Sequence, residues 1–222
     1  MKPAQNVIHQ PAARQILTRQ GSAITPLGLA AYENQDARCV RAAYEAGINL
    51  FFFYNLSYQP FLNELAAIAA TDRANLIIAA GSSARSQMGL EQDLAATLQA
   101  LDTDYLDVYL AEYISPDDDL TMLWSAAGVV QQLQHLKARG LIRYAGVSTH
   151  SRELALQCVE SRSVDVIMHR YNMAHRKAED VVFPAAIAAS LPIWAFTATR
   201  WGTLLKGHPN WSTSPPAAAD CY

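Results

Sequence analysis

The chain repeats one pattern along most of its length: a short apolar run typical of a β-strand precedes a longer stretch with the apolar spacing of a helix. Parallel strands produce this alternation, because a tight turn cannot join them and a crossover helix can. The expected strands span 26–31, 47–53, 75–80, 105–111, 142–147, 164–168 and 192–197. The expected helices span 35–46, 60–70, 90–101, 121–139, 152–160 and 176–189.

The spacing of these units favours a (β/α)8 barrel of the TIM type. One unit takes about 25–35 residues, which is what a strand, a helix and two loops require. The chain has room for about seven such units, and we expect the eighth to be missing, as in a shortened form of a longer protein. An open doubly wound sheet is the structural alternative. Barrel strands without an eighth neighbour expose backbone groups, so we expect an oligomer formed through these unpaired edges.

Length and composition indicate one domain, 1–222. A chain of 222 residues that is 51% hydrophobic and 17% charged can bury one substantial core. Residues 1–25 are expected to form an N-terminal arm with a hairpin that turns near Gln20 and Gly21. Residues 208–222 contain three prolines and are expected to form an irregular tail.

Charge and cysteine usage indicate which class of partner and which cellular compartment to expect. The net charge is -3 and no run of Lys or Arg occurs, which argues against a nucleic-acid surface and favours a small-molecule ligand or substrate. Cys39, Cys158 and Cys221 show no CxxC spacing, and an odd count suits a reducing compartment, so we expect a cytoplasmic protein. The apolar runs are too short to span a bilayer, so no membrane contact is expected.

Five ordered motifs resemble those of one known family. They are PLGLAAY (26–32), GINLFFFYNLSY (47–58), LDTDYLDVY (101–109), KARGLIRYAGVS (137–148) and AFTATRWGTLLKG (195–207). Together they resemble barrel strands of the aldo-keto reductase superfamily, whose members are (β/α)8 barrels. The resemblance implies an NAD(P)H-dependent oxidoreductase of carbonyl compounds.

The resemblance also implies a catalytic tetrad of Asp, Tyr, Lys and His, which this chain matches only in part. Phe52 lies at the place of the Asp, Gly81 at that of the Lys and Glu112 at that of the His. Tyr58 lies one residue beyond the place of the Tyr, where Ser57 stands. Tyr58 and Glu112 are therefore the candidate catalytic residues. A protonated carboxyl at Glu112 can polarise a carbonyl, and a carboxylate solvated at the rim is the alternative.

The residues with which the family holds the nicotinamide are also matched only in part. Ser148 and Thr149 lie at the place of a Ser-Asn pair, Met168 at that of a Gln, and Phe196 at that of an aromatic residue that stacks on the ring. Ser148, Thr149 and Phe196 are the candidate cofactor residues. The segment that binds the 2′-phosphate would follow the eighth strand, so the resemblance implies NADPH binding in a weakened form.

Further candidate ligand-pocket residues follow the strands at their carboxyl ends, where barrels place their chemistry. They are Tyr54, Asn55, His150, His169, Arg170, Asn172, Arg200 and Trp201. The histidines and arginines among them can bind an anion. No metal is expected, because no carboxylate stands at a ligand spacing from them. Aromatic residues packed under loops, and a surface Arg resting on Trp201, are the structural alternatives.

Three functional hypotheses remain open from the sequence. Loss of the lysine and of its carboxylate partner is expected to alter or weaken carbonyl reduction, because a lysine ammonium lowers the pKa of the acidic tyrosine in the family's mechanism. A non-catalytic barrel that binds a small ligand or regulates another protein is the second hypothesis. A remnant of a longer gene product without a function of its own is the third.

Overall fold

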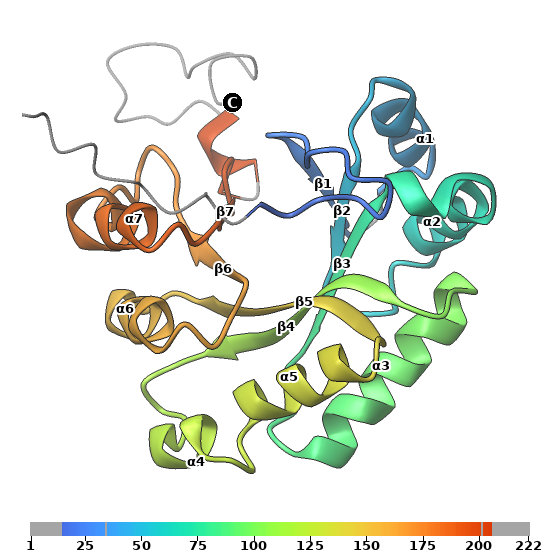
Figure 1. The fold of residues 1–222 in the computed structure, drawn as a ribbon. Helices are drawn as coiled ribbons and strands as arrows, with labels where there is room; N and C mark the ends of the chain where they lie inside the picture. The colour runs from blue at the N-terminus through green and yellow to red at the C-terminus, as the bar shows by residue number, and fades with distance from the viewer. Residues whose placement is uncertain (1–14, 34, 201, 206–222) are drawn as a thin grey trace, which may run out of the picture.

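The computed structural model describes residues 15–33, 35–200 and 202–205. Seven parallel strands form one sheet in chain order, and the sheet curls so that the helices cover its outer side (Figure 1). The strands are β1 (Gly28–Ala30), β2 (Leu50–Phe53), β3 (Ile77–Ser82), β4 (Leu106–Ile114), β5 (Ile142–Thr149), β6 (Val166–Arg170) and β7 (Ile193–Phe196). This order confirms the barrel class with seven units. It excludes a doubly wound sheet, in which the strand order reverses partway.

Seven α-helices and two short 3-10 helices connect the strands in the described part of the chain. They are α1 (Arg38–Glu45), α2 (Gln59–Asp72), η1 (Arg73–Asn75), α3 (Gln87–Leu101), α4 (Leu120–Trp124), α5 (Val129–Ala138), α6 (Arg152–Ser161), α7 (Ala178–Ala188) and η2 (Thr203–Leu205). In these residues we find no helix with the length and apolar character that crossing a bilayer requires.

The single helix expected over 121–139 is wrong, because the chain turns between α4 and α5. Gly128 lies close to the end of α4, and a Cβ atom on it would stand 2.2 Å from the carbonyl oxygens of Met122 and Leu123. Only glycine tolerates such an approach of backbone to backbone. The turn therefore ends one helix and begins the next.

Side chains of each strand alternate between two apolar layers. Phe51 and Phe53 are buried in the outer layer, between the sheet and the helices, whereas Phe52 faces the interior of the barrel. The interior layer also holds Val108 and Leu110 of β4. Strand geometry imposes this alternation, so it predicts which residue of each strand reaches the end of the barrel interior.

The N-terminal arm closes one end of the barrel. Leu17 and Ala23 form an antiparallel bridge, and Gly21 turns the chain with φ 88°. Arg143 of β5 donates to the carbonyl oxygen of Leu17 at 2.8 Å, and the side chain of Ile16 is buried in the interior layer. The arm is thus joined to the sheet by both polar and apolar contacts. The expected tail, 208–222, lies outside the described residues.

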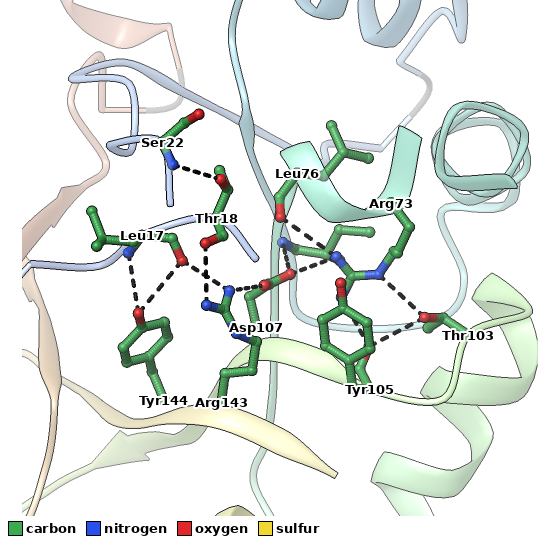
Figure 2. Close-up of polar contacts among 11 residues, drawn as sticks. Leu17, Thr18, Ser22, Arg73, Leu76, Thr103, Tyr105, Asp107, Arg143 and Tyr144 are labelled. Carbon is green, nitrogen blue, oxygen red and sulfur yellow. Dashed lines mark hydrogen bonds and ion pairs between the residues drawn. The ribbon is translucent and has the colours of Figure 1, made fainter. Parts of the chain in front are cut away.

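Asp107 of β4 helps to join η1 and the N-terminal arm to the sheet at this end of the barrel (Figure 2). Its buried carboxylate lies 2.7 Å from Nη1 of Arg73 on one side and 2.7 Å from Nη1 of Arg143 on the other. It also accepts a hydrogen bond from the backbone N–H of Ile78. A buried carboxylate is tolerated because these donors replace its hydration. The network lies at the amino ends of the strands, opposite the end that barrels use for chemistry.

Candidate functional site

The carboxyl ends of the strands meet at one end of the barrel, which we call the mouth. The inward side chains nearest the mouth are Phe52 of β2, Gly81 of β3, Glu112 of β4, Ser148 of β5, Arg170 of β6 and Phe196 of β7; each follows by alternation from interior residues of its strand. Most of these positions were singled out in the sequence. Their convergence makes the mouth the candidate site.

Glu112 stands at an irregularity of β4. The register with β5 runs from Ala111 opposite Val147 to Ile114 opposite Thr149, so β4 carries one extra residue here. Such a bulge re-aims side chains and frees backbone groups. The freed N–H of Tyr113 donates to Oγ of Ser148 at 2.9 Å, and Tyr113 itself takes a φ of 53°.

The Glu112 side chain is buried without a cation. Only 4% of the residue is exposed, and burial raises its pKa to about 8. A Cβ atom added to Gly81 would stand 2.3 Å from Cγ of Glu112, so the carboxyl group occupies the space that a side chain at position 81 would need. In the described residues, no ion pair involves Glu112. The group is therefore largely protonated near neutral pH.

Tyr58 belongs to the outer apolar layer. It is 5% exposed, packs with Phe61, and its ring centroid lies 5.4 Å from that of Tyr54. Burial is the main cause of the raised pKa of its phenol, followed by a hydrogen bond to Tyr54. It also lines a cavity of about 270 Å³ with Tyr32, Glu33 and other residues of the first two loops. Its catalytic role stays a prediction.

Tyr54 and Tyr113 extend the mouth on either side of Glu112. The pKa of Tyr113 is raised by burial, then by the charges of Glu112 and Tyr54. The sequence reasoning missed Tyr113; its position directly after Glu112 gave no signal, because a regular strand would have turned it outward. Asn55 has a structural contact instead, since its Oδ1 accepts a hydrogen bond from the N–H of Ser57 at 2.9 Å.

The candidate cofactor residues differ in how far they can reach a ligand. Ser148 accepts from Tyr113 and keeps its own hydroxyl hydrogen for another acceptor. Thr149 is fully buried, donates to the carbonyl oxygen of Ile114 at 2.6 Å, and accepts from the N–H of Ser151. Phe196 faces inward with its ring centroid 5.1 Å from that of His150. These three assignments stay predictions.

Basic side chains follow β5 and β6. Burial lowers the pKa of His150, and the nearby Arg170 and His175 lower it further. Asn172 places His175: its Oδ1 lies 3.2 Å from Nδ1 of that histidine, while its Nδ2 donates to the carbonyl oxygen of Thr197. Asn172 thus joins the loop after β6 to the loop after β7.

The remaining predicted residues lie away from this cluster or outside the described chain. His169 is 2% exposed and alternates to the outer side of β6; among the described residues its Nδ1 has no hydrogen-bond partner, and burial lowers its pKa. Arg200 is exposed at a turn in which its N–H donates to the carbonyl oxygen of Thr197. Trp201 is not among the described residues. A search of those residues finds no group of His, Cys, Asp or Glu suited to a metal ion.

Comparison with known proteins decides the family. The sequence model of the Aldo/keto reductase family matches residues 27–213. The chain belongs to this family. The NADH-specific methylglyoxal reductase of Escherichia coli (strain K12) is 24% identical over 119 residues, which make up 54% of this chain. The matched stretch spans only 36% of that relative's length.

Solved structures of the aldo/keto reductase family share the fold. A protein from Pseudomonas aeruginosa described as an aldo-keto reductase superposes with a TM-score of 0.68 at 26% identity, covering 85% of this chain and 79% of the other. The aldo-keto reductase of Klebsiella pneumoniae, solved in complex with NADPH, has a TM-score of 0.71 at 18% identity and covers 86% and 70%. The second likeness concerns the fold alone.

Proposed function

We propose that the chain is an NAD(P)H-dependent reductase of small carbonyl compounds in which neutral Glu112 supplies the proton. Family membership supports an oxidoreductase of this type. The observation that carries the proposal is the state of the Glu112 carboxyl group: it is buried at the mouth, forms no ion pair in the described chain, and has a pKa of about 8. A neutral carboxyl group can donate a hydrogen bond to a carbonyl oxygen and release its proton as negative charge develops there.

The mouth offers some of the contacts that a bound nicotinamide needs. Ser148 has a hydroxyl hydrogen available for the carboxamide oxygen, and Phe196 offers an inward ring against which the nicotinamide can stack. The cofactor would supply the hydride. The solved relative that holds NADPH supports the choice of cofactor. Thr149 contributes less, because both of its hydroxyl interactions are already made within the fold.

The acid in this proposal differs from the tyrosine of the family. No lysine of the described chain lies on an inward strand position, and the hydrogen bond between Asn55 and Tyr58 lowers the pKa of Tyr58 by less than burial raises it. Phe52 replaces a carboxylate by an apolar ring, and the Glu112 side chain fills the room beside Gly81. We infer an altered site with slow turnover, in which Glu112 is the only buried acid at the mouth among the described residues.

The test is reduction of methylglyoxal by the purified chain, followed through the loss of NADPH or NADH absorbance. Glu112→Gln keeps the shape of the side chain and removes the proton, so turnover should fall by about 10²-fold or more. Glu91→Gln makes the same change in an exposed pair with Arg139 and should leave turnover unchanged. Equal turnover in wild type and Glu112→Gln would contradict the proposal.

A non-catalytic, ligand-binding barrel is the second candidate. The described strands have no inward lysine, and Phe52 lies in the interior layer; both observations favour it. Thermal unfolding of the wild-type chain with saturating NADPH separates the two, because a ligand that binds the folded state raises the melting temperature. If NADPH does not raise the melting temperature and the chain shows no turnover, the non-catalytic binding function is favoured.

A further inference from the structure

One side of the mouth carries a positive charge, Arg170, that pairs with no carboxylate among the residues the structure describes. Arg170 ends β6 on the inward side, is half-buried, and takes part in none of the ion pairs of the described chain. Arg170 and His175 both act on the pKa of His150 as like charges. A guanidinium that is partly withdrawn from water and unpaired gains from binding an anion.

Aromatic rings border this charge and Glu112. Tyr113 and His150 have ring centroids 5.9 Å apart, and the His150 ring lies 5.1 Å from Phe196. On the other side, Phe52 and Tyr54 are 6.4 Å apart. Tyr54 and Tyr113 remain 41% and 52% exposed, which is high for rings of this size. Exposed aromatic surface around a polar centre is typical of a ligand site.

We propose that the mouth binds a substrate that joins an aromatic body to a carboxylate, with Arg170 holding the carboxylate and the rings of Tyr54, Tyr113 and Phe196 holding the body. This inference rests on the proposed function, since it names the substrate class for the acid Glu112. His150 and His175 lie near Arg170, and Asn172 keeps His175 in place.

The positions of Glu112 and Arg170 on the sheet limit the size of the substrate. Glu112 lies on β4 and Arg170 on β6, so their strand axes are about 10 Å apart when neighbouring strands are spaced at about 4.8 Å. Both side chains reach inward from these strands. One small molecule can therefore place its carbonyl at Glu112 and its carboxylate at Arg170, as an aryl-substituted oxo acid would.

The test uses 3-phenylpropionate, which has the carboxylate and the ring but no carbonyl group to reduce. Calorimetric titration of the full chain without cofactor should show binding of 3-phenylpropionate and much weaker binding of the neutral 3-phenylpropionamide. Arg170→Gln should weaken 3-phenylpropionate binding at least tenfold, which corresponds to about 1.4 kcal/mol. Arg170→Lys keeps the charge and should retain part of the affinity.

Arg176→Gln is the matched control, because Arg176 lies on the same loop and is already paired with Glu179. It should leave the affinity unchanged, and circular dichroism of each variant checks the fold. Equal binding of acid and amide, or equal losses in the Arg170 and Arg176 variants, would overturn the proposal. So would a loss of NADPH affinity in Arg170→Gln with 3-phenylpropionate binding intact, which would assign the charge to a cofactor phosphate.

Failure of this inference can be told from failure of the proposed function. The titration contains no cofactor and no reducible group, so it does not depend on turnover. If Glu112→Gln abolishes reduction and still binds 3-phenylpropionate, both proposals stand. If the wild type reduces methylglyoxal but does not bind 3-phenylpropionate, only the substrate class is wrong.

Discussion

The chemistry of the mouth depends on the burial of one carboxyl group. Glu112 owes its position to the bulge in β4, to the absence of a side chain at Gly81, and to the hydrogen bond between Tyr113 and Ser148. A non-glycine residue with positive φ, such as Tyr113, costs about 1–2 kcal/mol. Strain of this kind persists only where the surrounding structure holds it, and it is common at functional sites.

Burial of Glu112 should make stability depend on pH. Because its pKa is raised from 4.5 to about 8, the folded chain holds a proton that the unfolded chain releases between these values. Stability should therefore fall as pH rises through this window, at up to about 1.4 kcal/mol per pH unit. Glu112→Gln should flatten this part of the curve and exceed the wild type in stability at pH 8. Urea unfolding at several pH values measures it, and parallel curves for the two proteins would contradict it.

At the scale of elements, the end opposite the mouth is held by charge pairing. Asp107 of β4 joins η1, β5 and, through Arg143, the N-terminal arm (Figure 2). Tyr105 adds to this by stacking under Arg73, whose guanidinium carbon lies 3.8 Å from the ring centroid. The ion pairs at this end are thus independent of the strain and the unpaired charge at the mouth, although the buried Tyr105 hydroxyl has no hydrogen-bond partner among the described residues.

Asp107→Ala should be strongly destabilising. The change leaves two partly buried guanidinium groups without their carboxylate and one backbone N–H without its acceptor. Breaking a buried pair from one side costs about 3–5 kcal/mol. Urea unfolding measures the loss, with Glu91→Ala as a control that breaks a more exposed pair and should change stability little. A loss as small as that of the control would show that the network is not structural.

For the whole molecule, the sheet has two ends in the described part of the chain. β1 pairs only with β2, and β7 pairs only with β6. Edge strands in a curled parallel sheet present backbone donors and acceptors that another chain can pair with. The carboxyl ends of β1 and β7 border the mouth. A partner strand paired with either of them would therefore also lie beside the candidate site.

We expect the chain to self-associate through these edges. Light scattering over a range of concentrations should show species larger than a monomer. Ala195→Lys, which places a charge on the exposed side of β7, should shift the distribution towards the monomer, because charged side chains discourage edge pairing. A stable, monodisperse monomer at every concentration would rule out this expectation.

Local patterns were enough to predict the order of the elements. Alternation and helical spacing depend on a few neighbouring residues, so all seven strands lie at or within a few residues of their expected ranges. The family motifs predicted tetrad places for Phe52, Gly81 and Glu112, and strand alternation brings all three inward near the mouth, while their roles stay predictions. The helix over 121–139 was misjudged because the contact at Gly128 comes from the fold and leaves no trace in the periodicity.

By itself, the sequence predicted a barrel, the resemblance to the family, and most of the residues at inward positions near the mouth. Only the tertiary structure decided that the Glu112 carboxyl group is buried without an ion pair in the described chain and that a bulge brings Tyr113 beside it. It also decided that Thr149 is turned into the fold and that Arg170 lacks an ion-pair partner among the described residues. The reason is that a side chain's charge state and partners depend on groups brought together from separate strands. Those distances are set when the sheet curls, not by neighbours along the chain.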